Sequence, residues 1–246
     1  LGDVTFLRKL QEVTDLDKER ALYEKAIDEL VLFQWEGTKN KKNKNLEAFS
    51  LNFDFEKLNW EVSFAIEHFY INYLKREIKP GDKKIIDDGF ADICHYLAKQ
   101  PRVFTHRDYH SRNIMVQSGK DEKLCVIDFQ DARMGPQQYD LASLLRDSYY
   151  QLSEDQIVIL VDYYIAKWEA VSGQKINEKD FWHVFDLMSI QRNFKAIGSF
   201  ASFLSLRSDA SYLKYIGNTF ENIRRVLLKH PKYSSLREVL FYYYYF

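Results

Sequence analysis

The chain has 246 residues, enough to bury a sizeable core as one domain or as two closely packed parts. Its formal net charge of −1 argues against a large nucleic-acid surface, because phosphate binding needs a basic excess. The cysteines, Cys94 and Cys125, lie in apolar surroundings, which predicts buried thiols in a reducing compartment rather than a disulfide. No apolar run approaches the roughly 18 residues of a membrane span, and the first residues do not resemble a signal peptide. We therefore expect a cytoplasmic protein.

The first long helical pattern begins after a candidate cap at Asp15 or Asp17 and is expected to end at Gly37. Residues 39–45 follow with four lysines and no apolar anchor. Nucleic-acid or membrane binding is one interpretation of such a run, but a short charge run is usually a solvated loop. We expect a surface loop.

A second helix is predicted from Asn52 or Asp54 to Leu74, and residues 80–82 (Pro-Gly-Asp) are expected to break it. A further amphipathic pattern over residues 85–98 ends before a proline.

The C-terminal half also reads as helical, with a loop expected at residues 134–136. Ser153, followed by two acidic residues, is a helix-start signature, and Gly173 is the matching stop. The last six residues, Phe-Tyr-Tyr-Tyr-Tyr-Phe, are more apolar than is typical of a disordered terminus. The helices are predicted over residues 139–150, 157–171, 177–206 and 212–228.

The centre of the chain contains two stretches, residues 103–116 and 124–132, joined by a turn-like cluster at residues 118–122. The first begins with an apolar run typical of a short strand and then breaks into a polar loop, and the second is an apolar run that ends on Asp128. A hairpin is the economical interpretation. It would bring Asp128 close to the loop that carries Asp108 and Asn113. The predicted fold class is therefore α+β, mostly α-helical, with a small central β-hairpin that carries the site.

Two carboxylates and an amide oxygen converging at one end of a small sheet would suit Mg²⁺, a hard cation that proteins hold through few oxygens. Asn113 and Asp128 could hold the metal on a triphosphate. Asp108 would then accept the proton of a hydroxyl that attacks the γ-phosphorus. Phosphoryl transfer requires mainly this positioning and charge neutralisation.

The loop His106-Arg-Asp-Tyr-His-Ser-Arg-Asn113 has the H-x-D-x-x-x-x-N form of the kinase catalytic loop, and Asp128-Phe129 stands where kinases place the metal-binding Asp-Phe. With His110 and with Asp128-Phe-Gln-Asp-Ala132 in place of Asp-Phe-Gly, the chain resembles the aminoglycoside phosphotransferase and choline kinase superfamily. The resemblance is closest to bacterial anomeric sugar kinases, which act on N-acetylmuramic acid and N-acetylglucosamine in cell-wall recycling. Three further stretches carry it: Gly135-Pro136, Tyr139–Asp147 and Gln191–Gly198.

This resemblance implies ATP and Mg²⁺ as cofactors, Asp108 as the catalytic base, and Asn113 with Asp128 as metal ligands. Asp140 would brace the catalytic loop by accepting backbone N–H bonds, and His106 would support the same loop. The substrate would be a small molecule, a sugar or an amino alcohol. Charge and hydropathy predict no nucleic-acid or membrane partner. The sequence leaves the oligomeric state open, with a monomer as the expectation. The fold implied is the C-terminal lobe of a protein-kinase-like fold.

The resemblance also implies a domain organisation. Residues 1–246 would form the lobe, with 1–15 just after the inter-lobe hinge, 103–132 holding the catalytic loop and metal-binding hairpin, and 139–230 forming a helical substrate subdomain. No glycine loop or lysine-bearing strand precedes His106, and the chain begins Leu-Gly-Asp without methionine. We therefore expect the N-terminal lobe to lie outside this chain, which alone would bind nucleotide poorly and be inactive.

Acceptor-binding residues are predicted from position. Arg133 follows the metal-binding hairpin, and Arg192 with Lys195, three apart on one helix face, could meet a carboxylate or sugar hydroxyls. Glu61 could accept hydrogen bonds from a sugar. Each has a plainer alternative, namely capping, surface ion pairing or simple solvation.

Other functions remain open at this point. His106, Asp108 and His110 alternate, so on a continuing strand they could bind Zn²⁺ or Mn²⁺ in a hydrolase, although Asn113 would then have no role. A non-catalytic helical binding module derived from a kinase is another alternative. Among kinases, Asp131 with Glu61 could line an acidic cleft for an aminoglycoside, and choline is a further candidate. The basic residues named above instead favour a neutral or acidic sugar phosphorylated at its anomeric hydroxyl.

Overall fold

A computed structural model describes residues 2–40, 45–117 and 123–246. The predicted turn at 118–122 and most of the predicted lysine-rich loop, 41–44, lie outside the described residues. The chain forms two compact units, each of which is described by itself. Unit 1 contains Leu1–Asn52 and Pro101–Phe185, and unit 2 contains Phe53–Gln100 and Asp186–Phe246.

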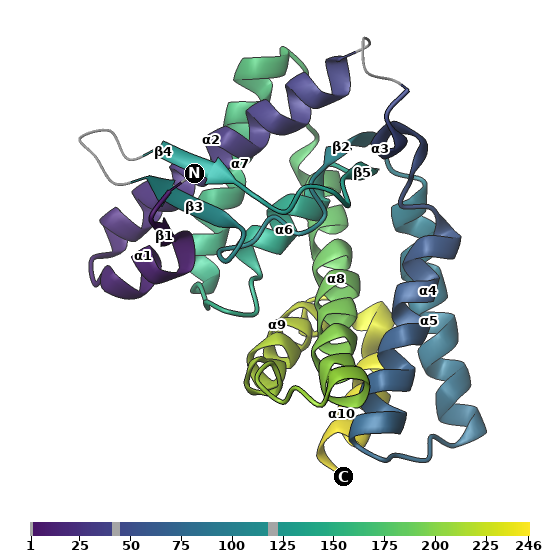
Figure 1. Cartoon of the computed structure of the whole chain (residues 1–246). Coiled ribbons are helices and arrows are strands. Elements are labelled where there is room, and N and C mark those ends of the chain that lie inside the picture. The colour runs from purple at the N-terminus through teal and green to yellow at the C-terminus, as the bar shows by residue number, and fades with distance from the viewer. Residues whose placement is uncertain (1, 41–44, 118–122) are drawn as a thin grey trace. The chain divides into compact units, whose positions relative to one another are not determined.

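In unit 1, the long helix α2 packs along α7 (Figure 1). Asp15 caps α2 by accepting hydrogen bonds from the N–H groups of Asp17 and Lys18. Gly37 does not end this helix as predicted. It lies inside the helix because Phe104 packs against it, so that a Cβ there would stand 2.7 Å from the Phe104 ring. The helices of the unit are α1 (Phe6–Glu12), α2 (Leu16–Lys39), α3 (Glu47–Ser50), α6 (Gln138–Leu145) and α7 (Glu154–Ser172).

The described strands of unit 1 include the predicted central hairpin, formed by β3 (Ile114–Gln117) and β4 (Lys123–Val126) with Met115 opposite Cys125. The short β1 (Val4–Thr5) adds to the other side of β3. The hairpin places Asn113, just before β3, next to Ile127, just after β4. The hairpin prediction is confirmed.

A second antiparallel pair joins β2 (Arg102–Thr105) to β5 (Arg133–Pro136). The loop predicted at residues 134–136 is therefore wrong. Its Gly-Pro sequence favours a turn locally, but Met134 lies opposite Phe104, and Pro136, which cannot donate, lies at the end of the strand. Pairing with a strand some thirty residues away overrides the local preference.

Unit 2 is built from helices. Asp54 caps α4 (Phe55–Ala65), which continues directly into the π-helix η2 (Ile66–Tyr73). Pro80 opens α5 instead of only breaking the preceding helix, because its missing N–H costs nothing at the first helical position. The other elements are α5 (Pro80–Ala98), η3 (Leu213–Tyr215), α9 (Ile216–Leu228), η4 (Pro231–Tyr233) and α10 (Ser234–Tyr245), with α8 (Glu178–Arg207) entering from unit 1.

The core of unit 2 is rich in aromatic side chains. Phe90 stacks on Phe194 with ring centroids 4.5 Å apart, and both are fully buried. The aromatic tail is part of this packing, since Tyr244 stacks on Phe220 at 4.3 Å and the Tyr70 hydroxyl donates to the Leu240 carbonyl. The C-terminal helix therefore packs on this core through one face that includes Leu240 and Tyr243, while Tyr242, Tyr245 and Phe246 are exposed.

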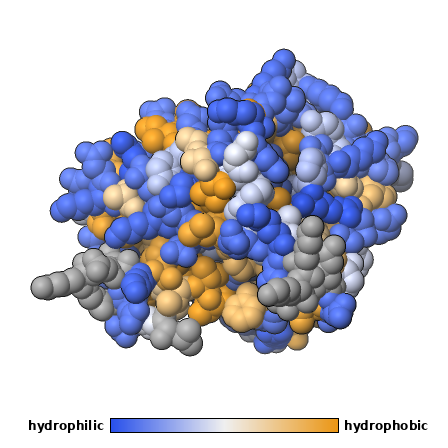
Figure 2. Space-filling view, turned by 90° about the horizontal axis from the view of Figure 1, so that it is seen from above, coloured by the Kyte–Doolittle hydropathy of each residue, from blue (hydrophilic) through white to orange (hydrophobic). Residues whose placement is uncertain are grey.

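The surface carries both polar and apolar side chains. Figure 2 shows one face on which an apolar area lies among polar side chains. None of the described helices combines the length and the apolar character that crossing a bilayer requires.

Candidate active site

The loop over residues 106–113, which the sequence predicts to be the catalytic loop, leaves β2 at Thr105 and turns through Arg107, whose φ of 80° lies in the left-handed region. A non-glycine residue adopts this conformation at a cost, so other contacts must hold it. The buried carboxylate of Asp140, in α6, does so. Its two oxygens accept the N–H groups of His106 at 2.7 Å and Arg107 at 2.9 Å.

The His106 ring links the catalytic loop to the end of the hairpin. Its Nδ1 accepts the N–H of Asp108 at 3.3 Å, so the proton must be on Nε2, which donates to the Ile127 carbonyl at 2.9 Å. Both ring nitrogens are therefore occupied within the protein. The ring is fully buried and links Asp108 to Ile127, the residue before Asp128.

Asp108, Asn113 and Asp128 converge. The Asn113 side-chain amide donates to the Asp108 carbonyl at 3.0 Å and to Asp128 Oδ2 at 3.2 Å. Backbone pairing fixes this register, because the Ile127 N–H donates to the Asn113 carbonyl at 3.0 Å. Asp128 is exposed and has a φ of 67°, a second strained residue at the site.

The donor set fits a magnesium ion. Because both hydrogens of the Asn113 amide are engaged by the chain, its oxygen Oδ1 remains available to a cation beside the Asp128 carboxylate. Hard oxygen ligands of this kind suit Mg²⁺, which takes its other ligands from phosphates and water. In the described part of the chain no three His, Cys, Asp or Glu side chains gather into a metal cage. Both ring nitrogens of His106 are bonded within the protein, so His106 is not available as the metal ligand that the hydrolase alternative requires.

A second buried brace, Asp147, was not predicted. Its carboxylate accepts the N–H of Ser111 at 3.0 Å and that of Tyr149 at 2.9 Å, and it is 2% exposed. Asp147 thus holds the middle of the catalytic loop as Asp140 holds its start. The only sequence signal for it was its place at the end of the Tyr139–Asp147 stretch.

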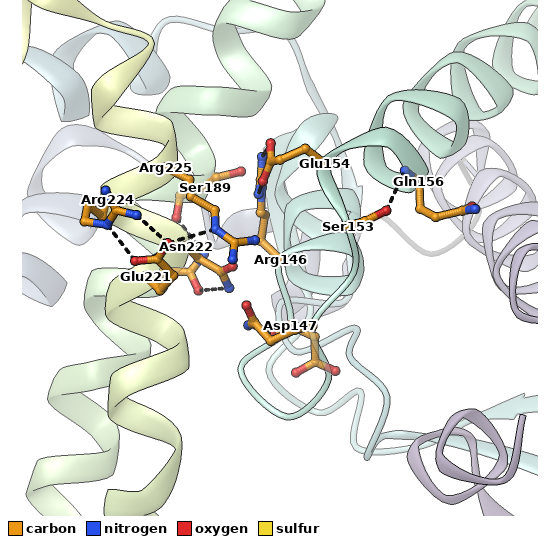
Figure 3. Close-up of polar contacts among 12 residues, drawn as sticks. Arg146, Asp147, Ser153, Glu154, Gln156, Ser189, Glu221, Asn222, Arg224 and Arg225 are labelled. Carbon is orange, nitrogen blue, oxygen red and sulfur yellow. Dashed lines mark hydrogen bonds and ion pairs between the residues drawn. The ribbon is translucent and has the colours of Figure 1, made fainter. Parts of the chain in front are cut away.

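Arg146, the neighbour of Asp147, anchors this part of the chain. Figure 3 shows its guanidinium facing the carboxylate of Glu154 at the start of α7, where it makes two hydrogen bonds. The arginine side chain is fully buried, and such a two-pronged pair has a fixed geometry. Ser153 caps the same helix by accepting the N–H of Gln156. The segment that carries Asp147 is therefore held rigidly to α7.

Gln130 and Asp131, which follow Asp128 in the chain, add further contacts. Gln130 donates its side-chain amide to Asp128 Oδ1 at 2.8 Å, and Asp131 forms an ion pair with Arg107 at 2.7 Å. The first contact orients the Asp128 carboxylate, and the second ties the hairpin loop to the catalytic loop. Asp131 is therefore engaged within unit 1 rather than held ready for a cationic substrate.

The predicted acceptor residues lie in both units. In unit 1, Arg133 is 8% exposed at the start of β5, and its carbonyl accepts the Thr105 hydroxyl. In unit 2, Arg192 and Lys195 lie on α8, the first 4% exposed and the second half-buried. Glu61 is 1% exposed, accepts the Gln191 side-chain amide at 3.2 Å and lies 3.6 Å from the Lys57 ammonium. Glu61 is therefore not the solvated helix residue of the plainer alternative.

Comparison with known families and proteins gives a consistent result. The profile of the phosphotransferase enzyme family (APH) matches residues 6–173. An N-acetylmuramate/N-acetylglucosamine kinase of Neisseria meningitidis is 30% identical over 242 residues, 98% of this chain and 69% of that protein. A protein of the same name from Pseudomonas aeruginosa is 33% identical over 225 residues, 89% of this chain and 62% of that protein.

Solved structures share the fold. The choline kinase of Cryptosporidium parvum has a TM-score of 0.62 at 13% identity, covering 98% of this chain and 73% of that one. The ADP-bound aminoglycoside phosphotransferase APH(2'')-Ib has a TM-score of 0.53 at 18% identity, covering 91% and 69%. The predicted fold class, mostly helical and protein-kinase-like, is confirmed. The chain spans roughly two thirds of the length of these relatives.

Proposed function

Because the chain belongs to the phosphotransferase enzyme family, and so to the small-molecule kinases, we propose that it takes part in moving the γ-phosphate of ATP to the anomeric hydroxyl of an amino sugar. N-acetylmuramic acid and N-acetylglucosamine are the proposed acceptors, which would place the reaction in cell-wall recycling. The names of the curated relatives support the acceptor class. The convergence of Asp108, Asn113 and Asp128 carries the reaction type.

The roles follow from the geometry of unit 1. Asp108 is the proposed general base, since its backbone is held by His106 and its half-buried carboxylate belongs to the loop braced by Asp140. Asn113 Oδ1 and the Asp128 carboxylate would hold Mg²⁺, which, when bound, neutralises charge on the phosphates. Gln130 would keep the Asp128 carboxylate in one orientation.

The acceptor-binding roles of Arg133, Arg192, Lys195 and Glu61 remain predictions. Arg192 and Lys195 stand one helical turn apart on α8 and favour an acceptor with a carboxylate or hydroxyls. Glu61 is bonded to Gln191, the residue next to Arg192, so its effect on the acceptor would pass through the position of α8. An aminoglycoside or choline acceptor is the second candidate, supported only by fold neighbours of low sequence identity.

A panel of acceptors tests the proposal on the natural full-length protein. Amino sugars, kanamycin and choline are each incubated with Mg-ATP, and the products are identified by phosphorus NMR. We expect sugar 1-phosphate from the amino sugars. Turnover of kanamycin or choline without turnover of the sugars would overturn the acceptor assignment, and no turnover of any acceptor would favour a non-catalytic binding module.

Asp108→Asn tests the catalytic role. Removing a general base typically costs 10²–10⁴-fold in rate, so we expect turnover to fall by roughly that factor. Nucleotide affinity should stay nearly unchanged, because Asp108 is not a proposed metal ligand. Asp88→Asn is the matched control, since Asp88 is a surface acid paired with Lys84. Equal activity of both variants would contradict the role of Asp108.

A further inference from the structure

Unit 2 contains a groove of about 710 Å³ between η2 and the end of α8. Its volume falls in the range of small-molecule sites, roughly 300–1,000 Å³. The groove involves none of the residues of the catalytic loop or of the metal-binding hairpin, which belong to unit 1. Its chemistry can therefore be considered independently of the proposed kinase reaction.

One wall of the groove is the π-helix η2. It runs over eight residues, and its last turn closes with the Leu74 N–H donating to the Phe69 carbonyl at 2.9 Å. Lys75, with a φ of 56°, ends the element in the left-handed region. π-helical segments are rare, are usually a single turn, and occur frequently at functional sites. Because π-helical bonds link residues five apart, Tyr73 lies one turn along from His68, and both line the groove together with Asn72.

His68 presents one defined atom to the groove. The ring is 8% exposed, and its Nδ1 lies 3.0 Å from the hydroxyl oxygen of Ser205. That hydroxyl donates its own hydrogen to the Ser202 carbonyl, so Nδ1 must carry a proton and donate to Ser205. Nε2 is then the acceptor nitrogen of a ring that lines the groove. Phe64, 4.2 Å away between ring centroids, keeps the ring in place.

The remaining lining indicates the chemistry of the occupant. Glu67 and Lys75 bring one negative and one positive charge, which favours a ligand without net charge. The amide of Asn72 and the hydroxyls of Tyr73 and Ser205 both donate and accept. Ala201, Leu204 and Leu206 add an apolar surface that suits the C–H face of a sugar ring.

We infer that this groove binds a neutral monosaccharide, one hydroxyl of which donates a hydrogen bond to Nε2 of His68. A single ammonium group beside a carboxylate is a poor site for a phosphate. A quaternary amine would need more aromatic faces than Tyr73 alone provides.

Titration with N-acetyl-D-glucosamine, followed by NMR of the histidine ring nitrogens, tests the inference. We expect the His68 ring to show a protonated Nδ1 without ligand and a saturable shift of Nε2 with it. His68→Phe, which keeps the ring contact with Phe64 but removes the acceptor, should weaken binding at this groove by roughly five- to tenfold, the worth of one hydrogen bond. Asn72 is half-buried at the rim of the groove, so Asn72→Ala should weaken sugar binding without affecting folding.

His95→Phe is the matched control, because His95 stacks on Phe55 in the same unit and does not line the groove. It should leave the titration unchanged. The inference is overturned if the sugar does not shift the His68 signals, or if Asn72→Ala and His68→Phe bind as well as the unaltered protein. It is also overturned if inorganic phosphate or choline shifts His68 and the sugar does not. A sugar that binds only at the catalytic loop leaves His68 unshifted, so the two sites are distinguishable.

Discussion

Arg107 and Asp128 both hold left-handed backbone conformations. Arg107 directly precedes the proposed base Asp108, and Asp128 is itself a proposed metal ligand. Each such conformation costs on the order of 1–3 kcal/mol in a non-glycine residue and persists only where surrounding contacts enforce it. Asp140 enforces it at Arg107 through two backbone hydrogen bonds. The precision of the site therefore depends on a residue that would never touch the substrate.

Asp140→Asn should show this dependence. The substitution turns one acceptor into a donor that faces a backbone N–H, so a buried hydrogen bond is lost and a donor is left unsatisfied. We expect the free energy of unfolding to fall by about 2–3 kcal/mol and turnover to collapse even where the variant is folded. Urea unfolding and the acceptor assay measure the two effects. Asp88→Asn should change stability by no more than about 0.5 kcal/mol, and a similar result for Asp140→Asn would contradict the bracing role.

The reactivity of a single residue, Cys94, gives a second test. Burial, together with the negative charge of Glu61, raises the pKa of its thiol to about 12. At about pH 8 the group is therefore a thiol, and only the thiolate is nucleophilic. We expect a thiol reagent to modify the half-buried Cys125 first and to reach Cys94 only when urea unfolds the protein. Rapid modification of both cysteines in the native protein would contradict the burial of Cys94.

Helices α4 and α8 approach each other closely where Gly198 meets Ala65. A Cβ added at Gly198 would lie 2.4 Å from the Ala65 Cα and 2.6 Å from its Cβ. Real side chains do not pack at such distances, so only glycine permits this contact. The same helices carry Glu61 and Gln191, whose hydrogen bond depends on the approach.

Gly198→Ala should therefore destabilise the protein by about 1–3 kcal/mol through overpacking. Gly81→Ala is the matched control, because it lies in the first turn of α5 with nothing within 4 Å of a new Cβ. There the substitution should stabilise the protein by about 0.5–1 kcal/mol, since alanine loses less backbone entropy. Thermal or urea unfolding of both variants distinguishes them, and equal effects would contradict the close contact.

Across the whole molecule, buried tyrosines link stability to alkaline pH. Burial raises the pKa values of Tyr23, Tyr70, Tyr109 and Tyr164 well above the ordinary value of 10.0. Below that value both the folded and the unfolded chain keep these phenolic protons. Above it the unfolded chain releases them while the folded chain does not. The free energy of unfolding must then fall as the pH rises.

Above the ordinary pKa, each of these tyrosines should lower the free energy of unfolding by about 1.4 kcal/mol per pH unit, and their contributions add. Urea midpoints should be level up to roughly pH 9 and decrease steeply above about pH 10. Tyrosinate absorbance should appear together with unfolding. Ionisation of these tyrosines in the folded protein, or a level midpoint at high pH, would contradict their burial.

Much of this protein could be predicted locally. The spacing of Asp108 and Asn113, the hairpin alternation and the Ser153 cap with its Gly173 stop depend on neighbours a few residues apart. Hydrogen bonds of such short range are encoded by the residues themselves, so the sequence alone determined the catalytic loop, most helices and the mostly helical fold class.

The resemblance points to Asp140 and His106 as supports of that loop, but only the tertiary structure reveals Asp147 and the burial of the surrounding residues. Asp147 reaches Ser111 across 36 positions, and β5 forms because β2 lies beside it. Glu61 is buried against Gln191, 130 residues away, which no helical pattern could reveal. Contacts of this kind depend on how whole elements pack, because a side chain's burial is a property of its neighbours in space rather than in sequence.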